Sequence, residues 1–312
     1  MNQSWNTVVV AFSLCAGGAI AHAAPIYLPT NVGNGADAEV RESNPTQNRG
    51  ASTEIATRVI DRYKLGHPND GNDRNSVIYL QFDLSTLDSI NAVGSMLRLT
   101  LRNNNLTDAR ITDTDGVSPD HGSNGLQYYG IPGASFNELT LTYLNAPGLS
   151  PDGDVGTKDF NGDAMFLGDK DLPAIGSQSH LPVGSAVDFS SAALDAFLAA
   201  EWASNPNGVA VIAVTHRNLG LTPDPGALYD KAGSEPANWS NFNYLFNPKE
   251  QTTLNDDLSY DSDINDPGNL LGNPLGGADN STGAFSPQLI FVPAPPTAVL
   301  MAGAALLARR KR

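Results

Sequence analysis

The chain has 312 residues, of which 33 are acidic and 18 basic, and its formal net charge is −15. Such a surface repels nucleic acid and anionic membrane over most of the chain, so nucleic acid is not an expected partner. The single cysteine, Cys15, leaves the chain without an internal disulfide, and the length fits one large domain or two small ones.

Residues 1–23 predict an export signal. An apolar stretch at Val8–Ile20 is followed by Ala21 and Ala23, which are small residues at the two positions that a signal peptidase reads. Signal peptidase is therefore an expected partner, and cleavage would remove Cys15. The alternative interpretation of this stretch is a buried N-terminal helix.

Alternation of apolar and polar residues predicts that the mature chain is rich in β-strands. In the first strong strand, Ile78, Leu80 and Phe82 face one side, because successive side chains of a strand point to opposite faces. Val77 and Tyr79 face the other side. The predicted strands, in chain order, are Ser76–Leu84, Ser95–Asn103, Glu138–Leu144, Gly208–His216 and Pro287–Val292.

Two of these strands have different expected surroundings. In the second strand, Leu97, Leu99 and Leu101 alternate with polar residues, which predicts one face on a core and one in water. Gly208–His216 is apolar on both faces, which predicts a central strand that is buried on both sides.

One amphipathic helix is predicted at Ser190–Ala203, with Ser190 or Ser191 as its N-cap. Apolar residues recur there at helical spacing and form one stripe. The residues of this stripe, which we expect to face the core, are Leu194, Phe197, Leu198 and Trp202.

Three long polar segments interrupt the predicted elements, at Asn103–Ser135, Gly148–Val183 and Asn218–Ala284. Loops of such length in a compact domain are usually functional, stabilised by ions or disordered. The sequence has no internal repeat and no second core of similar size. Residues 24–291 are therefore expected to form one all-β sandwich with long loops and one short helix.

Five segments, taken in chain order, resemble the DNRLRE domains, which are grouped with the carbohydrate-binding modules of family ninety-six. The resemblance implies a non-catalytic jelly-roll β-sandwich of the kind carried on secreted proteins, some of which bind polysaccharide. The segments are ADAEVRESNPTQNRGAST (Ala36–Thr53), YLQFDLSTL (Tyr79–Leu87) with SMLRLTLRN after it, FNELTLTYLNAP (Phe136–Pro147), AVDFSSAALDAFL (Ala186–Leu198) followed by NGVAVIAV, and SPQLIF (Ser286–Phe291).

The end of the chain, VPAPPTAVLMAGAALLARRKR (Val292–Arg312), resembles a PEP-CTERM sorting signal. Its apolar run, Ala298–Ala308, is about 16 Å long as a helix, against about 30 Å of bilayer hydrocarbon. The resemblance implies transient membrane contact and cleavage near the proline motif by an exosortase-type processing enzyme. Release or attachment at the cell surface would follow. A permanent short anchor and a disordered tail are the alternatives.

No catalytic motif is present in the sequence. The histidines outside the signal lack the spacing of a metalloprotease, and the chain has no nucleophile elbow and no glycine-rich phosphate loop. We therefore expect a protein that is not an enzyme and requires no cofactor. A pair of acidic residues of the glycosidase type remains open, because acidic residues are plentiful.

Two loops are candidates for structural Ca²⁺, because carboxylate and amide oxygens at alternate positions of a turn suit a hard cation. The alternative for each loop is a solvated turn rich in Asp and Asn. The candidate ligands are Asp113 and Asp115 in DTDG, and Asp159, Asn161 and Asp163 in DFNGD.

Candidate polysaccharide-binding residues are exposed aromatics, on which sugar rings stack, and cations that pair with uronate carboxylates. The alternative for the tyrosines is packing of a loop on the sandwich, and for the tryptophan a plug under a long loop. The candidates are Tyr128, Tyr129, Trp239, Arg58, Arg62 and Lys64.

Together these features predict an exported, non-catalytic protein of the cell surface or extracellular matrix that binds polysaccharide through a β-sandwich. The first alternative is a structural component of matrix or biofilm that binds no sugar. The second alternative is a polysaccharide lyase or hydrolase.

Overall fold

The computed structural model describes residues 24–42, 44–60, 76–104, 125–151, 160–172, 184–205, 207–216, 241–254 and 277–292, without the side chains of 58–60, 103–104 and 241–243. Its strands all belong to one unit, Pro25–Val292. The predicted export signal and the predicted sorting segment from 293 onward lie outside the described residues, and both stay predictions.

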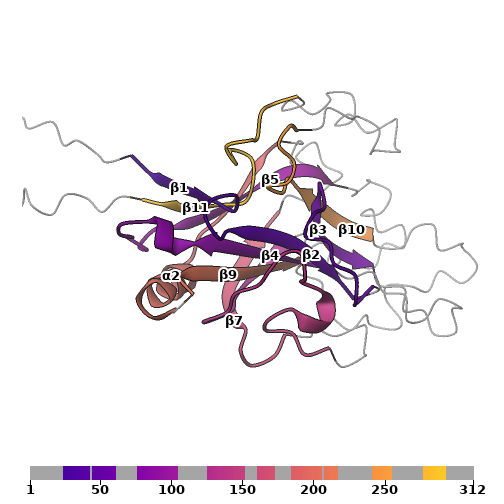
Figure 1. Ribbon diagram of the computed structural model, residues 1–312, viewed down its shortest axis with the longest axis horizontal. Helices are drawn as coiled ribbons and strands as arrows, with labels where there is room; N and C mark the ends of the chain where they lie inside the picture. Colours follow the sequence, from indigo (N-terminus) through magenta and orange to yellow (C-terminus); the bar gives the residue numbers. More distant parts are fainter. Residues whose placement is uncertain are drawn as a thin grey trace, which may run out of the picture. The chain divides into compact units, whose positions relative to one another are not determined.

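Within the described part of the chain, eleven antiparallel strands form two sheets (Figure 1). One sheet contains β1 (Ile26–Pro29), β11 (Gln288–Phe291), β5 (Met96–Asn104) and β8 (Ala186–Phe189). The other contains β2 (Ala36–Arg41), β3 (Ile55–Ile60), β4 (Ser76–Asp83), β6 (Gly125–Gly130), β7 (Met165–Asp171), β9 (Val209–His216) and β10 (Asn241–Phe246). The end of β5 also pairs with β10 and so joins the sheets. The predicted all-β sandwich with one short helix is confirmed.

The main core uses the alternating side chains that the sequence pattern predicted. Leu80 and Phe82 of β4 and Leu97 and Leu99 of β5 are fully buried in one apolar cluster. Arg98 points the opposite way from its leucine neighbours and its Nε donates to Asp188 Oδ1 at 2.7 Å. The predicted division of β5 into a core face and a more polar face is therefore confirmed.

The centre of the larger sheet is buried on both faces. On the side away from the main core, Tyr79 of β4 packs with Ile131, Leu141 and Tyr143, which follow β6 in the chain. Its hydroxyl donates to the carbonyl of Pro147 at 2.8 Å. All residues of β9 are buried, as predicted for that strand. Ligands therefore have access to the edges of this sheet and not to its middle.

The predicted strand at Glu138–Leu144 is wrong. The segment consists of turns followed by a short 3₁₀ helix, η3, at Tyr143–Asn145. Asn48 holds it in this shape, because its amide nitrogen donates to the carbonyls of Glu138, at 2.5 Å, and Leu141, at 2.8 Å. Leu141 and Tyr143 of this segment pack on the outer face of the sheet, and the segment does not extend it.

Helix α2 (Ala192–Ser204) begins where it was predicted, with Ser191 as its N-cap. The amide of Leu194 donates to the Ser191 hydroxyl at 2.9 Å, and the helix packs on β7 and β9. The prediction that Trp202 faces the core is wrong, because this residue is 38% exposed. The preceding residue, Glu201, is buried instead. The Glu201 carboxylate is bound by the Asn205 amide at 2.7 Å. No helix among the described residues combines the length and apolar character needed to span a membrane.

Strands also lie in the three segments predicted to be long polar insertions. These segments contain β6, β7 and β10, so they are corrected in part. β6 pairs with β9, β7 pairs with β6, and β10 pairs with both β3 and β5. Strand propensity did not predict β7, because this strand contains glycine and charged residues, which are rare in strands.

Strand β1 begins and β11 ends at the same end of the smaller sheet (Figure 1). Ile26 pairs with Phe291, and Pro29 pairs with Gln288. β11 also pairs with β5 on its other side. The first and last described strands are therefore neighbours, and β11 has a hydrogen-bonding partner on each side.

Candidate functional site

Tyr128 is a correction to the predicted sugar-binding set. It is fully buried in β6, and its ring stacks on Phe189 with 3.9 Å between ring centroids and 7° between ring planes. Burial raises the pKa of its hydroxyl, which stays protonated. The side chain belongs to the core because alternate residues of a strand face opposite sides, so no face of the ring is open to a ligand.

Tyr129 faces away from the main core, packs against the second apolar cluster and joins an aromatic cluster. Its ring stacks on Phe160 with centroids 4.2 Å apart and planes 15° apart, and it meets Phe166 at 5.4 Å and 58°. Phe166 is 47% exposed and its neighbour Met165 is 38% exposed. We name Tyr129, Phe160, Met165 and Phe166 the aromatic platform.

The pairing of β6 with β7 explains how this platform forms. The register shifts between Tyr128 and Tyr129, so that Tyr128 pairs with Gly168 and Tyr129 pairs with Phe166. Such an irregularity re-aims side chains at the edge of a sheet. β7 is the last strand in the pairing order, so no described strand pairs with its outer side. Phe160 and Phe166 were not among the predicted site residues, although the pair Met165-Phe166, two residues before Gly168, was a usable signal.

The platform combines apolar ring surface with hydrogen-bonding groups. The Tyr129 hydroxyl donates to Gln127 Oε1 at 3.3 Å. Burial and then the charge of Asp169 raise the pKa of this hydroxyl, so it stays neutral and can also accept a hydrogen bond. An amphipathic aromatic surface of this kind can stack on the C–H face of a sugar ring while binding its hydroxyl groups.

The second predicted calcium loop is described in part. The Asn161 Oδ1 accepts from the backbone amide of Asp163 at 2.9 Å, and its Nδ2 donates to the Ser150 hydroxyl at 3.0 Å. These bonds form an ordinary Asx turn and need no ion. Asp113, Asp115 and Asp159 lie outside the described residues. Within the described ranges, no group of three His, Cys, Asp or Glu side chains converges as a metal site.

The remaining predicted sugar-binding residues are not described as side chains. Arg58 lies on β3, where its backbone pairs with Asn243 and Ser76, but its side chain lies outside the description. Trp239, Arg62 and Lys64 lie outside the described residues. Their predicted roles therefore stay predictions.

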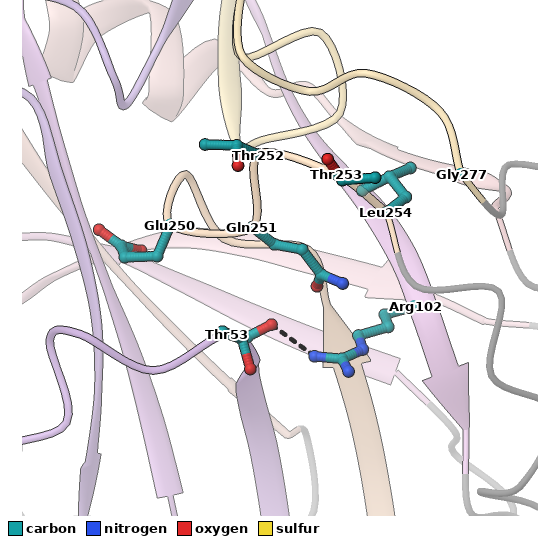
Figure 2. Close-up of a pocket in the computed structure, with 8 residues that line it drawn as sticks. All are labelled: Thr53, Arg102, Glu250, Gln251, Thr252, Thr253, Leu254 and Gly277. Carbon is teal, nitrogen blue, oxygen red and sulfur yellow. Dashed lines mark hydrogen bonds between the residues drawn. The ribbon is translucent and has the colours of Figure 1, made fainter.

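A polar hollow opens where the chain after β10 passes β5 and the start of β3. Its volume is about 540 Å³ (Figure 2). Arg102 lies on one side, where its Nη1 donates to the carbonyl of Thr53 and stands 3.6 Å from Glu54 Oε2. The residues that line the hollow are Thr53, Arg102, Glu250, Gln251, Thr252, Thr253, Leu254 and Gly277.

Beside the hollow, two carboxyl groups share a buried space. Asp37 Oδ2 accepts from the Thr30 hydroxyl at 2.5 Å and from the Lys249 amide at 3.1 Å. Burial raises the pKa of both Asp37 and Glu250, and repulsion by Asp37 adds to the rise that brings Glu250 to about 9. Lys249 Nζ stands 2.6 Å from Glu138 Oε2 and is 3.9 Å from Glu250. Glu250 is therefore protonated at neutral pH.

Scans of the chain against protein-family models and against curated proteins found no match. The resemblance to DNRLRE domains and to the PEP-CTERM signal therefore remains an expectation from the sequence, and the geometry of the described residues carries the functional argument.

Proposed function

We propose that the chain is an exported, non-catalytic protein of the cell surface or extracellular matrix that binds polysaccharide through the aromatic platform. The observation that carries the proposal is the exposed ring of Phe166 beside the outward-facing ring of Tyr129. Aromatic side chains grouped on an open surface mark interaction sites more often than chance exposure does.

The charge of the protein supports a glycan as the occupant of the platform. With a net charge of −15, the protein repels polyanions such as nucleic acid, whereas a neutral sugar ring is not repelled. Stacking on aromatic rings depends little on charge. Uronate polymers stay candidates through Arg58, Arg62 and Lys64, which lie in the most basic part of the sequence.

The buried carboxyl pair gives no support to the enzyme alternative. Asp37 is fully buried and contacts Glu250 directly. A glycosidase pair must flank a sugar bond, with about 5 to 9 Å between its carboxyl groups. Because Asp37 is fully buried against Glu250, a substrate cannot lie between the two carboxyl groups, although Glu250 also lines the hollow.

Affinity gel electrophoresis of the mature protein tests the proposal, with alginate, pectin and neutral hydroxyethylcellulose in the gels. We expect retention on at least one polymer and loss of most of it in Phe166→Ala, because a central aromatic contact carries much of the binding energy. Tyr27→Ala is the matched control, because Tyr27 is an exposed aromatic on the opposite terminal strand, β1. Wild type that migrates unretarded in all three gels would favour a structural matrix component.

Processing at both ends is part of the same proposal. Signal peptidase removes residues 1–23, and an exosortase-type enzyme cleaves near the proline motif after transient membrane contact by the segment 292–312. Mass spectrometry of the protein from its own host tests this, since an intact Met1 or an intact Arg312 contradicts the corresponding cleavage.

Structural Ca²⁺ in the loops of Asp113–Asp115 and Asp159–Asp163 is a further part of the proposal. Thermal melting with and without excess EDTA tests it. A lower Tm in EDTA, restored by added Ca²⁺, supports a bound ion, and an unchanged Tm contradicts it.

A further inference from the structure

The polar hollow is assembled from three parts of the chain that are distant in sequence. Thr53 precedes β3, Arg102 lies on β5, and residues 250–254 follow β10. Arg102 is held in place by the Thr53 carbonyl and the Glu54 carboxylate. A fixed guanidinium and a set of threonines therefore surround the open space.

Gln251 points to a ligand in this space. The residue is only 7% exposed, and its Oε1 is buried without a hydrogen-bond donor among the described residues. Figure 2 shows its amide directed toward Arg102, into the hollow, whereas Glu250 points away from it. A buried acceptor without a donor destabilises the folded protein. A hydroxyl donor from a ligand would remove that destabilisation.

The lining defines the chemistry of the ligand. Arg102 and the Gln251 amide nitrogen donate hydrogen bonds, the Gln251 oxygen accepts them, and Thr252 and Thr253 carry hydroxyl groups that do both. Leu254 supplies one apolar patch. A sugar presents alternating hydroxyl donors and acceptors around an apolar ring, and so fits this combination better than an apolar ligand or a lone ion does.

The hollow and the aromatic platform are separate sites. In the order of strand pairing, β3, β4, β9 and β6 lie between β10 and β7. Neighbouring strands are about 4.8 Å apart, so one sugar ring cannot reach both sites. The buried centre of the sheet lies between them and offers no continuous binding track.

We infer that the hollow around Arg102 and Gln251 binds a second segment of glycan, so that one copy of the protein joins two polysaccharide chains. The inference rests on the proposed function, because it takes the platform as the first site. Two sites on one rigid body convert weak single contacts into avidity and cross-link flexible polymers. The protein then holds a matrix together as well as adhering to it.

A bridging assay tests the inference with the mature protein. Beads carry alginate, pectin or hydroxyethylcellulose, the protein is bound to them, and the same polymer with a fluorescent label is added. Wild type is expected to capture the labelled polymer. Gln251→Ala is expected to bind the beads through the platform, yet to capture about tenfold less label, because it keeps one site. Phe166→Ala, which keeps only the hollow, is expected to bind the beads weakly and to capture little label. Tyr27→Ala is the matched control and captures label as wild type does.

Further variants separate binding from folding. Thr252→Tyr adds a large side chain at an exposed residue that lines the hollow, so it should abolish bridging without lowering the Tm. Light scattering checks that each protein is a monomer, since a dimer bridges with one site per copy. Capture by both Gln251→Ala and Thr252→Tyr at the wild-type level overturns the inference and leaves the proposed function standing. Failure of wild type to bind any bead overturns both.

Discussion

Strands β9 and β7 belong to the same sheet but meet very different surroundings. Every residue of β9 is buried, with apolar side chains on both faces. β7, at the edge, buries Leu167 and exposes Met165 and Phe166. The difference separates two tasks, because the centre of the sheet stabilises the fold and its edge offers surface for binding. Substitutions in β7 can therefore change binding while the protein stays folded.

The largest expected effect is a cavity in the centre. Ile212 of β9 is fully buried, so Ile212→Ala should lower the free energy of unfolding by about 2 to 5 kcal/mol. Urea unfolding followed by circular dichroism measures it. A loss below that of Phe166→Ala would break the distinction between centre and edge.

The next prediction tests whether burial, and not position at the edge of a sheet, sets the free-energy cost of ionising a carboxyl group. Among the described strands β2 pairs with β4 alone and is also an edge strand, yet its Asp37 is fully buried beside Glu250. Below about pH 4.5 Glu250 is protonated in both folded and unfolded chains. Between about pH 4.5 and the folded-state pKa of about 9, Glu250 is ionised only in the unfolded chain. Glu250 therefore lowers the stability of the protein as the pH rises through this range.

Glu250→Gln should therefore stabilise the protein by about 1 to 3 kcal/mol at pH 8 and have little effect at pH 4.5. Urea unfolding at the two pH values measures the change. Asp195→Asn is a control for general charge removal, because Asp195 lies elsewhere and binds the amides of Gly94 and Ser95. A gain in Glu250→Gln that is equal at both pH values would contradict the raised pKa of Glu250.

A smaller effect concerns the anchor of the edge strand. The Ser191 hydroxyl caps α2 and also donates to the Leu167 carbonyl of β7 at 2.7 Å. Ser191→Ala should cost about 1 kcal/mol. Hydrogen exchange should quicken in β7 and in the first turn of α2, with β9 unchanged. Equal quickening in β9 would mean that centre and edge open together.

The smallest expected effect on stability is at the platform itself. Phe166→Ala should change the free energy of unfolding by no more than about 0.5 kcal/mol, because half of the ring is already in water. The same variant is expected to lose polysaccharide retention. A large loss of stability would show that Phe166 is part of the fold, and would remove the reason to treat β7 as a binding edge.

Local patterns predicted those elements whose burial repeats with a simple period. β4, β5, β9 and α2 all show such periods, and all were predicted near their observed bounds. The Glu138–Leu144 segment has a strand-like pattern too, but Asn48, distant in sequence, binds its carbonyls and holds it in turns. A pattern of side chains does not reveal a competing partner for the backbone.

The candidate site was harder to predict for a similar reason. Tyr128 and Tyr129 are adjacent and chemically identical, and only the pairing of β6 decides that one is in the core and the other outside. Phe160 and Phe166 reach Tyr129 through contacts between strands. The hollow is formed by residues distant in sequence, among them Thr53, Arg102 and Gln251. The local sequence around each of them does not predict that the three lie together.

The position of β11 has a mechanical consequence. This strand lies between β1 and β5 and is hydrogen-bonded to both. A pull applied at Val292 along the strand loads both ladders in shear, so many hydrogen bonds must break together and not one after another. A sandwich tethered through its last strand would therefore resist drag from flowing water or a growing matrix better than one held by a peripheral strand.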